Sequence, residues 1–222
     1  MDFQTWRDEQ DEIYEKFRKK QELVKTNGIM PWTNKTRMGF YVEFKQPKNI
    51  SRVLGNLSLE ITRTAPSVYY DSQLLHTTIS DYQITDEEKF TPDFSVLAKF
   101  SDAIESVKKT LKQPKVHLGK ISYNETTTIV EGQPDINFYD CCMKIKDACK
   151  KQGIELREPW GAHSTIGRFY EQKTPEELDR FFDLMDKSSK IDKQIILPRI
   201  EVGTFMMSPR AITQFSVLEY KI

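Results

Sequence analysis

Two short motifs place a histidine and a threonine two positions apart. The chain contains three histidines, and two of them have this neighbour: His76 with Thr78, and His163 with Thr165. Both motifs lie in apolar runs that are typical of β-strands, and in a strand residues i and i+2 point to the same face. Each motif is therefore expected to present one imidazole and one hydroxyl group side by side.

These side chains are suited to the cleavage of a phosphodiester. That reaction needs a base for the nucleophile, an acid for the leaving oxygen, and donors that hold the phosphoryl oxygens. Histidine can fill both proton-transfer roles because its ordinary pKa is near 6.5. If the motifs face each other, His76 and His163 supply the acid and the base, and Thr78 and Thr165 bind the phosphate. Which histidine is the base stays open, and neither a metal ion nor another cofactor is required.

The remaining histidine and the cysteines suggest one chemical alternative. His117 lacks a hydroxyl residue two positions later and is interpreted as structural. Cys141, Cys142 and Cys149 could supply zinc ligands together with the two motif histidines. Their spacing matches no usual zinc pattern, however, and the segment that contains them has the periodicity of a core helix.

Charge and composition narrow the class of ligand. The 222 residues include 33 basic and 33 acidic side chains, a balance that argues against coating long nucleic acid by charge alone. A nucleotide or short oligonucleotide could still bind in a locally basic cleft. There is no disulfide framework, no signal-peptide pattern and no apolar run near the roughly 20 residues that span a bilayer. We expect a monomer without a membrane partner, located in the cytoplasm or, alternatively, the nucleus.

Periodicity predicts both helices and strands. Residues 1–28 are expected to form a charged amphipathic helix that extends a single two-lobed domain over residues 29–222. Within that domain a helix is expected to begin with Thr91 as its N-cap, and a capping box is expected at Thr174. Strands are predicted at 38–44, 72–79, 116–122, 126–130, 195–206 and 212–220, with further helices around 50–57 and 138–152. A strand, a helix and a motif strand thus recur in each half of the chain.

The paired motifs resemble those of the 2H phosphoesterase superfamily, which includes bacterial RNA 2′,5′-ligase-like proteins and eukaryotic cyclic phosphodiesterases. That family has two His-x-Ser/Thr motifs flanked by hydrophobic residues. The second motif here continues to Gly167-Arg168 and is similar to the frequent His-x-Thr-x-x-Arg form. The first motif is followed by Ser80-Asp81-Tyr82 where the family commonly has Leu-Gly. The resemblance extends from about residue 38 to the C-terminus.

The resemblance implies a pseudo-symmetric, two-lobed α+β fold, with antiparallel sheets lining a central cleft and helices outside. It also implies metal-independent hydrolysis or transesterification of a nucleotide 2′,3′-cyclic phosphate or 2′-5′ linkage. His76 and His163 would be the acid–base pair, and Thr78 and Thr165 would bind phosphate. The alternative is a non-catalytic nucleotide- or RNA-binding module that uses the same cleft.

Three further residues are candidates for substrate binding. Arg168 would point away from the cleft on a regular strand and would reach it only if the strand bulges at Gly167 or ends there. Tyr82 and Phe169 follow the two motifs and could stack on nucleotide bases. Packing in the core is the competing interpretation for both aromatic residues.

Overall fold

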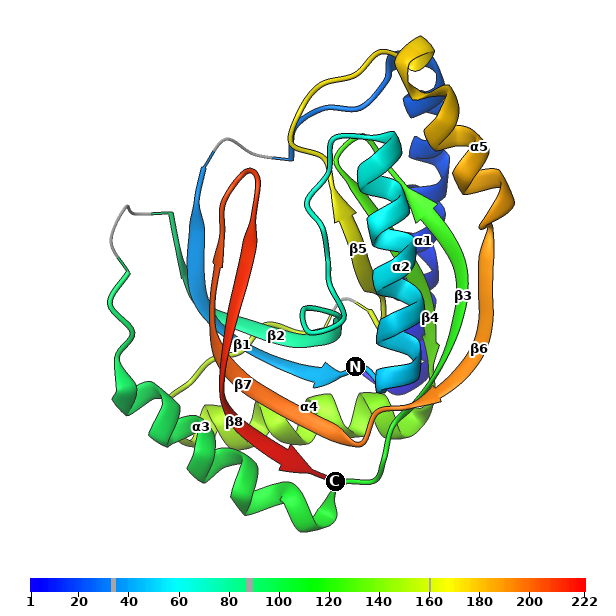
Figure 1. Ribbon diagram of the computed structural model, residues 1–222. Coiled ribbons are helices and arrows are strands. Elements are labelled where there is room, and N and C mark those ends of the chain that lie inside the picture. Colours follow the sequence, from blue (N-terminus) through cyan, green and yellow to red (C-terminus); the bar gives the residue numbers. More distant parts are fainter. Residues whose placement is uncertain (33–34, 87–89, 160) are drawn as a thin grey trace.

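The computed structural model describes residues 1–32, 35–86, 90–159 and 161–222. Within these ranges it contains five α-helices and two four-stranded sheets (Figure 1). The helices are α1 (Phe3–Asn27), α2 (Lys48–Thr64), α3 (Phe94–Val107), α4 (Ile136–Lys151) and α5 (Asp179–Lys187). The strands are β1 (Arg37–Lys45), β2 (His76–Thr85), β3 (Lys115–Tyr123), β4 (Thr127–Pro134), β5 (Ser164–Arg168), β6 (Lys190–Ile196), β7 (Arg199–Met207) and β8 (Ile212–Lys221).

Both sheets are antiparallel, with the strand orders β2-β1-β7-β8 and β5-β4-β3-β6. The first motif strand, β2, and the second, β5, occupy equivalent edge positions in their sheets. Each follows its neighbour through one helix, as β1-α2-β2 and β4-α4-β5. The two-lobed, pseudo-symmetric α+β fold predicted from the sequence is confirmed.

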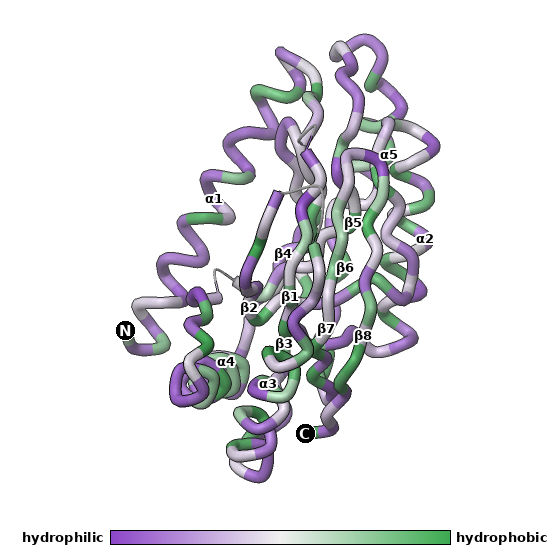
Figure 2. Tube along the Cα trace, turned by 90° about the vertical axis from the view of Figure 1, so that its left-hand side faces the viewer, coloured by the Kyte–Doolittle hydropathy of each residue, from purple (hydrophilic) through white to green (hydrophobic). Residues whose placement is uncertain are grey.

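The helices lie around the outside of the two sheets. In Figure 1, α3 and α4 lie together at the lower end of the molecule, while α1, α2 and α5 surround the second sheet. Figure 2 shows that α1 is predominantly hydrophilic, as its charged sequence suggests. Across the described ranges no helix has the length and apolar character needed to cross a membrane.

Polar as well as apolar contacts attach α1 to the rest of the fold. Trp6 is buried, and its indole Nε1 donates a hydrogen bond to the carbonyl of Pro159 at 2.6 Å. One and two turns further along, the side chains of Gln10 and Tyr14 are buried and donate to the carbonyl of Gly132 on β4. The helix therefore contributes hydrogen-bond donors to the second sheet, which hydrophobic periodicity alone does not predict.

The prediction of one strand over residues 195–206 is wrong. β6 ends at Ile196, and β7 begins at Arg199. Pro198 lies between them and has no N–H group to donate to a sheet, so the ladder is interrupted there. The chain uses this break to pass from the second sheet, where β6 pairs with β3, to the first, where β7 pairs with β1.

The start of α3 also differs from the prediction. The N-cap is Asp93 and not Thr91, and the Asp93 carboxylate accepts the N–H of Ser95 at 2.8 Å. Pro92 consequently precedes the cap instead of occupying the first helical turn. Aspartate and threonine are both good N-caps, so a sequence that offers both does not fix the boundary. The capping box at Thr174 is present as expected.

Candidate active site

Both motifs line one cavity of about 310 Å³ between the sheets. His76 is the first residue of β2, and His163 immediately precedes β5. Thr78 and Thr165 line the same cavity. The structure therefore brings together the four side chains that the sequence suggested for acid–base chemistry and phosphate binding.

A buried glutamine joins the two motif strands. Gln46 follows β1, and its Nε2 donates to Thr77 Oγ1 at 2.8 Å and to Ser164 Oγ at 2.7 Å. Thr77 and Ser164 are the middle residues of the two motifs, and both are fully buried. One amide group thus fixes the two strands relative to each other. No local sequence pattern marks Gln46, because its two partners lie in distant segments.

Strand β2 contains an irregularity directly after its motif. Thr78 pairs with Glu43 on β1, whereas Ser80 pairs with the preceding residue, Val42. Ile79 is therefore an extra residue, as in a β-bulge. Because directly opposed residues share one face of a sheet, the bulge reverses which later residues face the cavity.

This reversal explains the position of Tyr82, which does not point to the cavity as a stacking platform. Tyr82 pairs with the buried Phe40, and its ring packs edge-on against Phe100 with the centroids 6.1 Å apart. Asp81, one residue earlier, pairs with Tyr41, and both line the cavity. The interpretation of Tyr82 as a base-stacking residue is thus corrected to core packing.

Strand β5 has the same irregularity at the same distance from its histidine. Thr165 pairs with Ile129 on β4, and Gly167 pairs with Thr128, so that Ile166 is the extra residue. A bulge was one condition for Arg168 to reach the cleft, but it was expected at Gly167, whereas Gly167 is paired and the extra residue is Ile166. Arg168 accordingly lines the cavity together with the histidines.

Several contacts hold the guanidinium group of Arg168 in place. Its Nε donates to the hydroxyl of Tyr70 at 2.9 Å, and its Cζ lies 4.8 Å from the centre of the Trp32 ring. Thr127, the cross-strand partner of Arg168, accepts a longer hydrogen bond of 3.5 Å from its Nη1. A planar guanidinium fixed in this way can present its other N–H groups to a phosphate.

Phe169 is the second aromatic candidate that the structure corrects. Its side chain is fully buried, and its ring contacts Phe181 edge-on at a centroid distance of 5.5 Å. It follows Arg168, which the bulge has turned to the cavity, so Phe169 points into the core. It is therefore not available to stack on a base.

Burial keeps the histidine at the start of β2 neutral. His76 Nδ1 lies 2.6 Å from the carbonyl oxygen of Leu74, which can only accept, so Nδ1 carries a hydrogen. Burial lowers the pKa of His76 to about 4, and the positive charges of Lys45 and Arg168 act in the same direction. The Oε2 atom of Glu43 lies 3.4 Å from Nδ1.

His163 has a similar pKa but a different electrostatic neighbourhood. Burial lowers its pKa to about 3, and the charge of Arg168 adds to this shift. Both imidazoles are therefore neutral near pH 7 in the protein without substrate. A phosphodiester bound between them would add a negative charge, which favours protonation of one ring.

Glu43 is a site residue outside both histidine motifs and was not among the predicted site residues. It is fully buried, lines the cavity, and accepts a hydrogen bond of 2.9 Å from Gln214 Nε2. Burial raises the pKa of Glu43 well above its usual value, and the nearby Glu201 adds to the effect. Its signal in the sequence is a carboxylate inside the apolar run 40–44, since a charge in a buried strand is costly unless it has a role.

The cysteines do not join the motif histidines. Cys141, Cys142 and Cys149 are buried in α4, and the Sγ of Cys141 donates to the carbonyl of Lys112. Burial raises the pKa of all three thiols, which disfavours the thiolates that bind zinc. Among the described residues no group of three or more His, Cys, Asp or Glu side chains could hold a metal ion. The zinc site considered from the sequence is thus not formed by these residues.

Comparison with known proteins relates this geometry to solved structures. No family model matches the chain, and a search of curated protein sequences finds no relative. Among the solved structures that share the fold is TT0787 of Thermus thermophilus, with a TM-score of 0.55, 8% identity, and coverage of 82% of this chain and 97% of that one. Another is E. coli LigT complexed with 3′-AMP, with a TM-score of 0.51, 9% identity, and coverage of 84% and 98%. A third is the MHV ns2 PDE domain, with a TM-score of 0.50, 9% identity, and coverage of 81% and 99%.

The similarity to these structures confirms the fold that the sequence resemblance implied. Each similar chain is covered almost completely, so the likeness includes both lobes and both sheets. This chain shares the two-lobed fold of the 2H phosphoesterases.

Proposed function

We propose that this chain is a metal-independent phosphodiesterase that cleaves a nucleotide or short oligonucleotide at a 2′,3′-cyclic phosphate or a 2′-5′ linkage. One observation carries the proposal: two His-x-Thr motifs from separate lobes line a single cavity, with Arg168 beside them. The similar solved structures support a phosphoesterase function, because they include a PDE domain and LigT crystallised with 3′-AMP.

The two lobes suggest how the proton-transfer roles are divided. Burial favours the uncharged form of Glu43 while His76 is neutral, but a protonated His76 and an ionised Glu43, 3.4 Å apart, would stabilise each other. Arg168 disfavours protonation of both histidines, so the feature that distinguishes them is the carboxyl group of Glu43 in contact with His76. We therefore assign His76 as the general acid and His163 as the general base.

The reaction then follows in one displacement at phosphorus. His163 takes the proton of a water or a ribose hydroxyl group, and the oxygen forms a bond to phosphorus. The bond from phosphorus to the leaving oxygen breaks, and that oxygen receives the proton of His76. Thr78, Thr165 and Arg168 donate hydrogen bonds to the non-bridging oxygens, whose charge grows in the transition state. Water as the nucleophile gives hydrolysis, and a ribose hydroxyl gives transesterification.

The test is turnover of a substrate panel in the presence of EDTA. The panel contains 2′,3′-cyclic nucleotides, 2′-5′ and 3′-5′ oligoadenylates and cyclic dinucleotides. The wild type is compared with His76→Ala and His163→Ala, and with His117→Ala as the matched control. His117 is a half-buried histidine that contacts Asp192 and lies outside the cavity. Loss of either motif histidine should lower kcat by on the order of a hundredfold or more, because an acid and a base act together.

The outcomes separate the alternatives. EDTA-resistant cleavage that both motif variants lose and His117→Ala keeps supports the two-histidine mechanism. Cleavage that survives both motif substitutions contradicts it. Tight binding of a nucleotide without turnover would support the non-catalytic binding module.

A further inference from the structure

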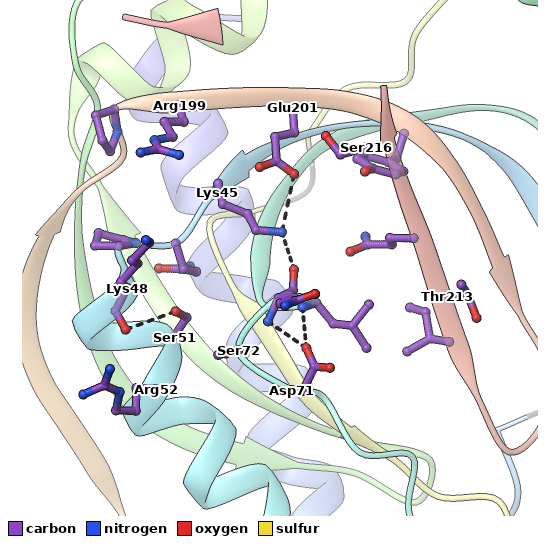
Figure 3. Close-up of a pocket in the computed structure, with 18 residues that line it drawn as sticks. Lys45, Lys48, Ser51, Arg52, Asp71, Ser72, Arg199, Glu201, Thr213 and Ser216 are labelled. Carbon is purple, nitrogen blue, oxygen red and sulfur yellow. Dashed lines mark hydrogen bonds and ion pairs between the residues drawn. The ribbon is translucent and has the colours of Figure 1, made fainter. Parts of the chain in front are cut away.

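A second and larger cavity adjoins the proposed active site. Its volume is about 870 Å³, and it shares Tyr41, Ile212 and Gln214 with the cavity of the histidines. Figure 3 shows Lys48 and Arg52 of α2 on one side and residues of β8 on the other. The two cavities are therefore adjacent and share part of their lining. A ligand longer than one nucleotide could occupy both.

Most charged groups in the second cavity already have partners. The cations Lys45 and Arg199 form ion pairs, and the carboxyl group of Asp71 accepts hydrogen bonds. Lys45 lies 3.4 Å from Glu201, and Arg199 lies 3.1 Å from Glu219. The carboxylate of Asp71 accepts backbone N–H groups of its own loop, at 2.7 and 3.0 Å. The two ion pairs balance the charges of Lys45 and Arg199, and the side chain of Asp71 is engaged by its own loop.

Two cations in the second cavity differ from the rest. Lys48 and Arg52 are one turn apart on α2, both are exposed, and neither makes an ion pair with any residue in the described ranges. Side chains three or four residues apart on a helix are neighbours, so the two cations can act on one anion. They lie in the first turns of α2, where the helix dipole also favours negative charge.

The other lining groups suit a phosphate better than a nucleobase. Ser72, Thr213 and Ser216 contribute hydroxyl groups, whereas the hydroxyl of Ser51 donates to the carbonyl of Lys48. Among the described residues that line this cavity, Tyr41 is the only aromatic one. Nucleobases are commonly bound by stacking on aromatic side chains, so this lining offers a base little. Cations with hydroxyl donors are the usual ligands of phosphate oxygens.

We propose that this cavity is a subsite for a second phosphate group of the substrate, held by Lys48 and Arg52. This inference rests on the proposed phosphodiesterase function and narrows its substrate class. The substrate carries at least one phosphate beyond the one that is cleaved, and a cyclic mononucleotide occupies only half of the site. The second phosphate is either the next internucleotide phosphate or a terminal phosphate.

Three oligoadenylate substrates distinguish these sources. The first is a dinucleotide that has only the scissile phosphate, the second is the same dinucleotide with a 5′-terminal phosphate, and the third is the trinucleotide. Each is tested with wild type, with Lys48→Gln/Arg52→Gln, and with Lys150→Gln/Lys151→Gln. The last variant is a matched control, because it removes two exposed cations from the end of α4, outside both cavities.

The α2 variant should raise KM about tenfold or more for a substrate with a second phosphate, since hydrogen bonds from charged donors are lost. KM for the one-phosphate dinucleotide should stay at the wild-type value, and the control should match wild type throughout. A response of the 5′-phosphorylated dinucleotide alone identifies a terminal phosphate, and a response of the trinucleotide identifies an internucleotide one. An equal rise for all three substrates, or no rise, overturns the subsite.

A binding measurement separates failure of the subsite from failure of the proposed function. Dissociation constants of the same oligonucleotides are measured for wild type and both double variants over a range of salt concentrations. Each lost phosphate contact should reduce the slope of log K against log salt by about 0.7 for single strands. If wild type cleaves nothing but the α2 variant loses affinity and slope for two-phosphate ligands, the subsite stands and the enzyme proposal fails. If wild type cleaves the dinucleotide and the α2 variant binds every ligand normally, the subsite alone is contradicted.

Discussion

Strands β2 and β5 have the same motif spacing and the same bulge, but their cavity-facing residues carry opposite charges. Five residues after the histidine, β2 has Asp81 and β5 has Arg168, and both line the cavity. The cross-strand partner of the motif threonine is Glu43 in the first sheet and Ile129 in the second. One lobe thus contributes two carboxyl groups to the cavity, of which Glu43 contacts the histidine, while the other contributes a guanidinium.

This difference shows how a nearly symmetric site can divide two unlike roles. Matching backbones place the two imidazoles and the two hydroxyl groups in equivalent positions. The charges then decide which imidazole more readily carries a proton, because an opposite charge nearby favours the charged form. In this interpretation both lobes supply the same geometry, and the contact of Glu43 with His76 supplies the difference in protonation.

The largest effect on activity is expected when the equivalent charged residues of the two strands, Arg168 and Asp81, are neutralised one at a time. Arg168→Gln should lower kcat/KM by on the order of a hundredfold, because a donor to the transition-state oxygens is lost. Asp81→Asn should leave kcat/KM within about threefold, since its only ion pair among the described residues is a long one of 3.9 Å with the exposed Arg157. Steady-state kinetics on the best substrate of the panel measure both effects.

Arg168→Lys is the control that keeps the positive charge but removes the planar guanidinium group. Lysine keeps the positive charge but lacks the fork that Tyr70 and Trp32 hold, so only part of the activity should return. Thermal unfolding of each variant shows whether the loss arises from misfolding. Equal losses in Arg168→Gln and Asp81→Asn would mean that the two positions are functionally equivalent, contrary to the comparison.

The second test concerns the carboxyl group beside His76. Glu43→Gln keeps the shape of the side chain but removes the carboxyl group that can ionise beside a protonated His76. The pKa of His76 in the enzyme–substrate complex should then fall, so the alkaline limb of the kcat profile moves to lower pH. A shift of about one pH unit lowers kcat by roughly tenfold above that limb. The acidic limb, which belongs to His163 as base, should not move.

A neighbouring glutamate provides the matched control. Glu201 is buried directly opposite Glu43 on β7 and contacts Lys45, whereas the carboxylate contact with His76 belongs to Glu43. Glu201→Gln should therefore leave both limbs of the pH profile in place. Glu43→Asp should keep the alkaline limb closer to its wild-type position than Glu43→Gln does. Movement of the acidic limb in Glu43→Gln would reverse the assignment of acid and base.

Local patterns were sufficient for the motifs but not for the residues around them. His76 and Thr78 are visible in the sequence because the two-residue period of a strand places them together. A bulge is defined by pairing between two strands, so the sequence of β2 alone does not show that Tyr82 turns to the core. In β5 the same limit left the direction of Arg168 open and made Phe169 a candidate for stacking.

Longer-range features were less accessible still. The two-lobed fold could be expected, because strand, helix and motif recur in each half of the chain. The second cavity could not, since it combines the start of α2 with strands at the other end of the chain. Glu43 did have a local signal, a lone carboxylate in an apolar strand, whereas the role of Gln46 depends entirely on two distant partners.

The smallest effect on catalysis is expected at Gln46, which joins the motif strands β2 and β5 and contacts both in the same way. Gln46→Leu removes the amide that binds Thr77 and Ser164, and it leaves two buried hydroxyl groups without this donor. Unfolding free energy should fall by about 1–3 kcal/mol, the usual cost of losing a buried partner. Chemical denaturation measures this loss, with Gln133→Leu on the exposed side of β4 as the control.

Catalysis should respond to Gln46→Leu in a different way from the charge variants. The amide contacts both motifs through equivalent atoms, so loosening it displaces the two histidines relative to each other without favouring protonation of either. We expect kcat to fall a few-fold while both limbs of its pH profile keep their positions. A shift of one limb would show that Gln46 acts through a single histidine. In that case the paired hydrogen bonds from Gln46 to Thr77 and Ser164 would not explain how the acid and the base are positioned.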